Sequence, residues 1–126
     1  MVVESAREKI LIIESHAASS ASLVELLGGA GYQVSTASAQ EAVRVARERG
    51  ADLVLLDAQL PGFAPLLSEL KGSAATSNTR VVLLSAGDPD KRARGLDLGA
   101  DDVVSHPWDS EELLAGARAV ARQACA

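Results

Sequence analysis

The chain has 126 residues, which suits one compact domain with a substantial core and is too short for two. Apolar residues make up 48% of it and aromatic residues only 2%, which favours helices packed on an aliphatic sheet over an aromatic-rich binding platform. The formal net charge is −5, from 17 acidic and 12 basic residues without a stripe of Lys and Arg, which argues against direct nucleic-acid binding by this segment.

The termini and the cysteine content exclude several further classes of protein. The single cysteine, Cys125, rules out an internal disulfide framework and a cysteine-based metal site. Residues 1–8 are polar and mixed in charge, so we expect a polar leader rather than a signal peptide. Since no apolar run is long enough to span a bilayer, we expect a soluble, cytoplasmic protein without membrane contact.

Continuous apolar runs predict strands that are buried on both faces, as in a parallel sheet. A further segment, YQVSTA at 32–37, alternates Tyr32, Val34 and Thr36 with polar neighbours and therefore predicts a half-exposed edge strand. The continuous runs are ILII at 10–13, LVLL at 53–56, VVLL at 81–84 and the short VV at 103–104.

Helical patterns fill the segments between these runs. Apolar residues recur at the helical spacing over 23–30, and a group of glycines ends that helix. A second such pattern covers 39–46. Ser38 and Glu41 form a capping-box pattern at its start, in which each side chain would satisfy an otherwise unpaired backbone N–H.

Three more helices follow along the chain. Leucines over 66–70 mark a short third helix. Asp88 followed by Pro89 resembles an N-cap with proline at the first helical position, which opens a fourth. Asp109 with Glu112 opens a fifth. The apolar face of this fifth helix consists of Leu113, Ala117, Val120 and Ala121.

Strand and helix thus alternate five times along the chain. Right-handed crossovers convert this order into an open parallel sheet with helices on both faces. We predict one doubly wound α/β domain over residues 1–126. The final letters, ARQACA, continue a helix without a clear cap, so we expect the segment to have been cut from a larger protein after residue 126.

Polar residues follow the predicted strands at their carboxyl ends. An open α/β sheet forms its binding sites at these ends. These positions are far apart in sequence, but the topology brings them to one rim. They are Glu14 and Ser15 after the first strand, Asp57 after the third, Ser85 after the fourth and His106 after the fifth.

Three segments resemble the signature segments of receiver domains from two-component response regulators. They are ADLVLLDAQLPG at 51–62, VVLLSA at 81–86 and GADDVVSHPWD at 99–109, and the resemblance covers essentially the whole chain. It implies a flavodoxin-like sheet of five parallel strands in the order 2-1-3-4-5, with five helices. It also implies that Asp57 is at the phosphoacceptor position and that the Ser85 hydroxyl contacts the phosphoryl group.

The resemblance implies a definite chemistry. The aspartate attacks the phosphohistidine of a sensor histidine kinase or phosphotransfer protein, while magnesium and a lysine neutralise the charge on the phosphoryl group. An aromatic residue on the last strand then rotates, which reshapes the face of the fourth helix, fifth strand and fifth helix. Partners bind this face, and on it we expect Arg92, Val103 and Trp108 to be contact residues.

This sequence departs from the family pattern at the metal ligands. The usual pair of acids after the first strand is Glu14-Ser15, and Ser15 offers a neutral hydroxyl where a hard cation prefers a carboxylate. The magnesium ligands that remain are Glu14 acting through a water, Asp57, and the backbone carbonyl of Gln59. We therefore expect magnesium binding to be weak.

Two other replacements affect the positive charge expected near Asp57 and the side chain expected to rotate on the last strand. The usual lysine is His106, whose ordinary pKa of about 6.5 makes it either a pH-sensitive cation near Asp57 or an uncharged loop side chain. The usual aromatic residue is Val103, which has no ring to rotate. A zinc site built from His16 and His106 with Glu14 and Asp57 is a further hypothesis, although no characteristic ligand spacing supports it.

We therefore predict a degenerate, pseudo-receiver-like signalling module that acts by protein–protein interaction. Phosphorylation of Asp57 is expected to be weak or absent, and we expect no enzymatic activity and no required cofactor. The first alternative is a functional phosphoaccepting receiver that uses Asp57 and magnesium. The second is a flavodoxin-like small-molecule binder, since fold does not fix function, although the loops contain no stacking aromatic residue or phosphate cradle.

Overall fold

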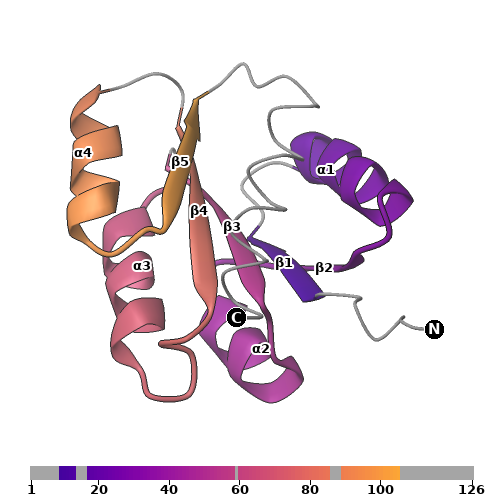
Figure 1. Ribbon diagram of the computed structural model, residues 1–126, viewed down its shortest axis with the longest axis horizontal. Coiled ribbons are helices and arrows are strands. Elements are labelled where there is room, and N and C mark those ends of the chain that lie inside the picture. The colour runs from indigo at the N-terminus through magenta and orange to yellow at the C-terminus, as the bar shows by residue number, and fades with distance from the viewer. Residues whose placement is uncertain (1–8, 14–16, 59, 86–88, 106–126) are drawn as a thin grey trace.

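Strands and helices alternate along the part of the chain that the computed structural model describes, residues 9–13, 17–58, 60–85 and 89–105 (Figure 1). In chain order the elements are β1 (Lys9–Ile13), α1 (Ala17–Gly29), β2 (Gln33–Ala37), α2 (Ala42–Arg49), β3 (Leu53–Asp57), α3 (Phe63–Gly72), β4 (Arg80–Ser85), α4 (Pro89–Asp97) and β5 (Asp102–Ser105).

The strands form one parallel sheet in the order β2-β1-β3-β4-β5, which confirms the predicted topology. Each continuous apolar run became a strand because its side chains are covered on both faces. The predicted fifth helix, with its start at Asp109, lies outside the described residues. Among the helices that the structure does describe, none combines the length and apolar content needed to span a bilayer.

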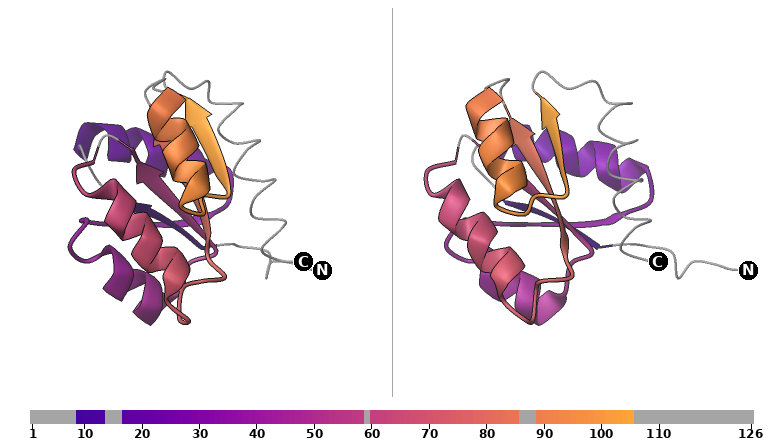
Figure 2. Two further views of the ribbon diagram at one scale, coloured as in Figure 1. Left: turned by 90° about the vertical axis from the view of Figure 1, so that its left-hand side faces the viewer. Right: turned by 60° about the vertical axis from the view of Figure 1, so that its left-hand side comes forward.

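Helices lie on both sides of the sheet, with α2, α3 and α4 on one face and α1 on the other (Figure 1, Figure 2). Strand residues alternate between two buried clusters. In β3, Val54 and Leu56 belong to the cluster under α2 and α3, whereas Leu53 and Leu55 belong to the cluster under α1. All four are at most 1% exposed, and burying each such side chain contributes about 1.5–3 kcal/mol.

The glycines after the first helical pattern end α1 with a Schellman motif. The Tyr32 N–H donates to the Leu27 carbonyl at 3.2 Å, and the Gly31 N–H donates to the Gly28 carbonyl at 3.1 Å. Gly31 has φ 101°, a backbone conformation that glycine adopts without steric cost. Tyr32 and Leu27 pack in the same apolar cluster, so this turn also leads the chain into β2.

The capping box predicted for α2 is wrong. Residues 39–41 form a turn, and the helix begins at Ala42 with Glu41 as N-cap and no side-chain capping bond. The Ser38 hydroxyl instead donates to the Glu41 carboxylate at 3.4 Å. The Glu41 carboxylate also pairs with Arg44 at 3.1 Å, and this interaction draws it away from the backbone.

The edge position predicted for 32–37 is confirmed, but the alternation fails at the end of the strand. Tyr32 and Val34 are half-buried against the cluster under α1, as expected. Thr36 is exposed, and among the β2 residues only Val34 packs against that cluster. Ala37 turns to the opposite face, where it packs in the cluster that contains Ala42 of α2.

The amino end of the sheet carries a partly buried ion cluster of Lys71, Arg80 and Asp101, here called the Asp101 cluster. Asp101 Oδ2 accepts from Lys71 Nζ at 3.2 Å and from the Val81 N–H at 2.7 Å, and Oδ1 accepts from Arg80 Nη1 at 3.3 Å. Lys71 Nζ also donates to the Thr79 carbonyl at 3.0 Å. The cluster therefore ties the last turn of α3 to the starts of β4 and β5.

α4 rests on the sheet through a glycine. Gly95 is buried, and a Cβ added to it would collide with Cδ2 of Leu83, a residue of β4 that is itself fully buried. The other α4 side chains that the structure describes are exposed, including Leu96 at 45%. The helix backbone thus lies directly on the sheet at Gly95, and the polar side chains that the structure describes are exposed.

Candidate functional site

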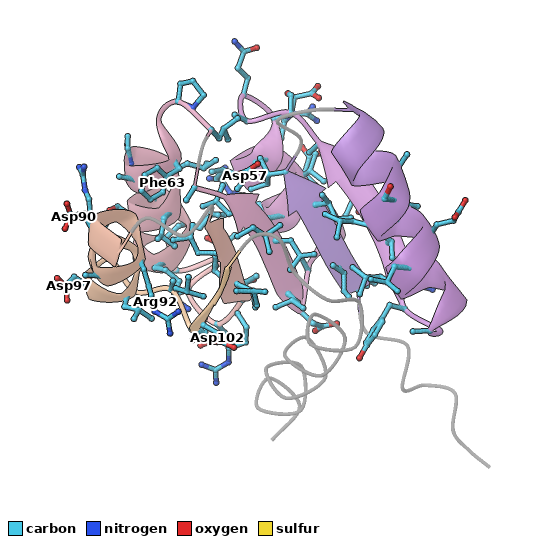
Figure 3. The ribbon with its side chains drawn as sticks, turned by 90° about the horizontal axis from the view of Figure 1, so that it is seen from above. Asp57, Phe63, Asp90, Arg92, Asp97 and Asp102 are labelled. Atoms are coloured by element: carbon cyan, nitrogen blue, oxygen red, sulfur yellow. The ribbon has the colours of Figure 1, made fainter. Side chains whose placement is uncertain are left out.

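Asp57 lies at the carboxyl end of β3, the central strand of the sheet. Figure 3 shows its side chain between the helices of the two faces. The Ala58 N–H donates to the Leu84 carbonyl at 2.8 Å, which extends the pairing of Asp57 with Leu84 on β4. Asp57 is half-buried, so its position is fixed by the sheet while part of the residue stays accessible to water.

Two backbone hydrogen bonds connect Asp57 with the start of α3. The Leu60 N–H donates to the Asp57 carbonyl at 3.1 Å, and the Phe63 N–H donates to the Leu60 carbonyl at 3.1 Å. Gly62, with φ 80°, takes the left-handed conformation needed at the N-cap. Phe63 follows it and is 7% exposed, so the only phenylalanine of the chain anchors this turn in the core.

Ser85 ends β4 one residue after Leu84, the pairing partner of Asp57. Its own pairing partner is Ser105, the last residue of β5. The structure therefore brings the backbones of Asp57 and Ser85 to one edge of the sheet, as the sequence predicted. Two predicted site residues far apart in the chain thus share the carboxyl rim.

Val103, at the position of the family's rotating aromatic residue, pairs with Leu83 in the interior of β5. Its side chain is 7% exposed and packs in the cluster under α2 and α3. Val103 therefore lies beneath the predicted partner face rather than on it. Arg92, predicted for the same face, is exposed on α4 (Figure 3).

Several predicted rim residues lie outside the described residues. The strand that precedes Glu14 ends at Ile13, which pairs with Leu56, and the strand that precedes His106 ends at Ser105. In the described part of the chain, no group of three or more His, Cys, Asp or Glu residues lies together as a metal site would require. The predicted residues outside this part are Glu14, Ser15, His16, Gln59, His106 and Trp108.

The magnesium ion implied by the family resemblance fits this donor set only in part. Within the described residues, Asp57 is the predicted ligand that contributes a carboxylate, and its place at the end of β3 suits such a role. The sequence also supplies Glu14, which follows the first strand, but it has Ser15 where the family usually has a second acid. The residues present would hold the ion less tightly than a full set of carboxylates.

Three features of the molecule escaped sequence-based prediction. The burial of Phe63 was not predicted, and its place after the Leu-Pro-Gly turn is the one feature of the sequence that indicates it. The close approach of Gly95 to Leu83 was not predicted, because a glycine within a helical pattern does not show which residue of the sheet lies against it. The Asp101 cluster was hidden because its members come from separate elements, 30 residues apart for Lys71 and Asp101.

A parallel five-stranded sheet with an aspartate ending its central strand and a serine ending the next defines the receiver type of doubly wound domain. The chain belongs to the response regulator receiver domain family, whose sequence model matches residues 10–118. This match leaves the alternative of an unrelated flavodoxin-like binder without support.

Curated relatives agree with this assignment. The chain is 42% identical over 117 residues to the uncharacterized transcriptional regulatory protein YkoG of Bacillus subtilis, a match that covers 90% of this chain and 51% of that protein. It is 36% identical over 118 residues to the phosphate regulon transcriptional regulatory protein PhoB of Pseudomonas aeruginosa, covering 90% and 52%. The chain thus spans about half the length of the curated relatives it matches.

Solved structures share the fold. A putative response regulator from Chloroflexus aurantiacus superposes with a TM-score of 0.87 at 26% identity, covering 92% of this chain and 98% of that one. The receiver domain of a signal transduction histidine kinase from Syntrophus aciditrophicus gives 0.83 at 28% identity, covering 92% and 91%.

Proposed function

We propose that this receiver acts chiefly through protein–protein contacts and that Asp57 is phosphorylated weakly or not at all. The contact face consists of α4, β5 and the predicted fifth helix, with Arg92 and Trp108 as contact residues and Val103 beneath them. In this proposal the module works in the cytoplasm, catalyses no reaction of its own and requires no cofactor.

The burial of Val103 is the observation that carries this proposal. A receiver that responds to phosphorylation through a rotating aromatic ring needs a side chain with two stable positions. Valine is branched at Cβ and stiff at χ1, and this one packs in the core beside β4. The face above it therefore lacks the moving part that would couple it to the rim.

The residues around Asp57 support the same conclusion. Ser15 replaces a metal-binding acid, and His106 replaces a cation that would be charged at every physiological pH. The first change weakens the binding of a metal cation and the second removes a permanent positive charge, and the transition state for phosphoryl transfer is stabilised mainly by electrostatics. The acceptor carboxylate is retained at the end of β3, but the groups that would activate it are weakened.

Mass spectrometry of the intact protein tests the proposal. After incubation with a small acyl phosphate donor and magnesium, we expect little or no addition of a phosphoryl group to the wild type. The Ser15→Asp/His106→Lys variant is expected to gain a phosphoryl group, and this gain should vanish when Asp57→Asn is added. Stoichiometric labelling of the wild type at Asp57 would instead support the alternative of a functional phosphoaccepting receiver.

The position of Asp57 favours that alternative as the second candidate. Its place at the carboxyl end of the central strand, beside the end of β4, suits attack on an incoming phosphoryl group. In this case a sensor histidine kinase or a phosphotransfer protein is the donor partner. Magnesium would then be held by Glu14, Asp57 and the Gln59 carbonyl.

The remainder of the signalling path lies outside this domain. YkoG and PhoB are named as transcriptional regulatory proteins, and each is about twice as long as the region matched. We propose that the output of this chain is likewise provided by another domain or a separate protein, since its net charge is −5 and its sequence has no stripe of Lys and Arg. Capture experiments with Arg92→Glu as the matched control would identify a partner of the α4 face.

A further inference from the structure

A hollow of about 400 Å³ opens at the amino end of β1 and β2, at the opposite end of the sheet from Asp57. We propose that this hollow binds a small phosphorylated molecule through its phosphate or diphosphate group. The described residues that line it are Lys9, Gln33, Val34, Ser35, Arg49 and Gly50.

The charge of the hollow is opposite to that of the chain. The protein carries a net charge of −5, yet Lys9 and Arg49 both line the hollow and none of its described lining residues is acidic. Arg47 lies in the same last turn of α2 as Arg49. Lys9 and Arg49 are both exposed, so their charges are available to a ligand from solution.

Neutral donors add to the two cations. Val34 packs with the cluster under α1, so the side chains of its neighbours Gln33 and Ser35 alternate to the opposite face, the one that α2 covers. Gln33 has an amide N–H₂ and Ser35 a hydroxyl. The hollow therefore presents four side chains that can donate hydrogen bonds to phosphate oxygens.

Lys9 is fixed at the wall of the hollow. Its backbone N–H donates to Asp52 Oδ2 at 2.8 Å, and its ammonium donates to the Arg49 carbonyl at 3.2 Å. The second bond places a positive charge on the last carbonyls of α2, which otherwise carry the negative end of the helix dipole. An ammonium has three N–H donors, and this bond uses one of them.

Gly50 keeps the other wall open. It has φ 73°, and a Cβ built on it would meet nothing within 4 Å. The residue therefore turns the chain out of α2 while projecting no side chain into the space. The volume falls in the range of roughly 300–1,000 Å³ typical of small-molecule sites. Arginine and lysine together favour a multiply charged phosphate over a single carboxylate.

A titration of the full 126-residue chain tests this inference. Inorganic phosphate and pyrophosphate are added at constant ionic strength, and amide shifts are followed by nuclear magnetic resonance. We expect saturable shifts centred on residues 33–35 and 49–50, with pyrophosphate binding tighter. Equal shifts from sodium chloride at the same ionic strength would overturn the proposal.

Variants of the cations separate a site from general charge attraction. Lys9→Met and Arg49→Met should each weaken pyrophosphate binding by about tenfold or more, since each removes a charged hydrogen bond. The matched control is Arg44→Met on the same helix, where the guanidinium already pairs with Glu41 and Glu48. We expect it to change the affinity less than twofold, and an equal loss would overturn the proposal.

Two further measurements complete the test. Thermal melting shows whether a variant is still folded, and Lys9→Met retains the backbone bond to Asp52. At the same concentration, pyrophosphate should raise the melting temperature of the wild type more than that of Arg49→Met, because binding to the folded state alone stabilises it. Binding to phosphatidylglycerol vesicles in place of pyrophosphate would assign the hollow to lipid headgroups and overturn the small-molecule proposal.

Discussion

Asp101 collects three donors on one carboxylate, and two of them are cations. Its side chain is 15% exposed and that of Lys71 is 19% exposed, so water screens the pair only in part. Hydrogen bonds to a partly buried charge contribute more than those between neutral groups, and a charge left without its partner is costly. At the residue scale this carboxylate is a polar anchor that joins α3, β4 and the start of β5.

We expect Asp101→Asn to lower the free energy of unfolding by about 1–3 kcal/mol. Asparagine keeps the shape of the side chain but removes the charge that balances Lys71 and Arg80. The measurement is urea denaturation at neutral pH, followed by circular dichroism.

Arg44 provides the matched control for an ion pair in water. It pairs with Glu41 at 3.1 Å and with Glu48 at 3.3 Å, but these side chains are 56–60% exposed. Arg44→Met should therefore cost about 0.5 kcal/mol or less. If both variants lose the same stability, burial is not what gives the Asp101 cluster its strength.

The residues of the rim were predictable to a greater extent than those of the Asp101 cluster. Asp57 and Ser85 follow apolar runs directly, and the rule for parallel sheets then places them at one edge. The partners of Asp101 depend on which elements lie beside one another at the other end, and no local pattern encodes that. Sequence motifs indicate where a strand ends, but not which side chains meet across the fold.

At the scale of elements, α4 shows how a single residue sets the distance between a helix and the sheet. Its charged sequence gives no apolar stripe and its described side chains are exposed, so the fit of Gly95 on Leu83 positions the helix. The position of the proposed partner face relative to the sheet therefore depends on the absence of one methyl group.

We expect Gly95→Ala to destabilise the protein although alanine is the better helix former. The gain in helix propensity is about 1 kcal/mol, whereas forcing a methyl group against the buried Leu83 costs about 1–3 kcal/mol. Urea denaturation gives the net loss, and amide shifts over α4 report its displacement.

Gly28→Ala in the last turn of α1 is the control for this change. A Cβ there would meet nothing within 4 Å, so the same substitution should be neutral or stabilise by up to about 1 kcal/mol. A gain of stability in both variants would show that α4 has more room than its contact with Leu83 indicates.

The ends of the elements were predicted less well than the elements themselves. The strands were predicted to within about one residue because continuous apolar runs have sharp limits. The start of α2 was missed because Ser38 and Glu41 can bond either to the backbone or to one another, and a sequence pattern does not distinguish these two outcomes.

The predicted fifth helix leads to a further prediction at the scale of elements. Its apolar face would cover the β4 and β5 side of the cluster that α1 also covers, where Val82 and Val104 lie. Leu113→Asp combined with Val120→Asp should therefore lower stability by more than 2 kcal/mol, on the order of two lost buried side chains. The same changes made at Arg118 and Arg122, which are not part of the predicted apolar face, should have little effect on urea denaturation.

At the scale of the whole molecule, the sheet is shared by two cores. Successive residues of β3 alternate between the cluster under α1 and the cluster under α2 and α3. If one cluster loses its packing, the sheet that the other cluster packs against is no longer intact.

We therefore expect one cooperative unfolding transition rather than two. Native-state hydrogen exchange should give the same free energy of opening for the amides of Val54 and Leu55, equal to the global value. Unequal values at these neighbouring positions would show that the two faces of the sheet unfold separately.

The pairing of β4 has a consequence for communication across the molecule. The same six-residue strand holds Leu84 opposite Asp57 at one end and Arg80 in the Asp101 cluster at the other. A shift of its register would break both connections at once, so each connection holds the strand in place for the other. The two ends are therefore energetically coupled, and this coupling is reciprocal. The described residues that line the hollow belong to β1, β2 and the end of α2 rather than to β4. We therefore expect a ligand in the hollow to stabilise the protein while leaving the reactivity of Asp57 unchanged.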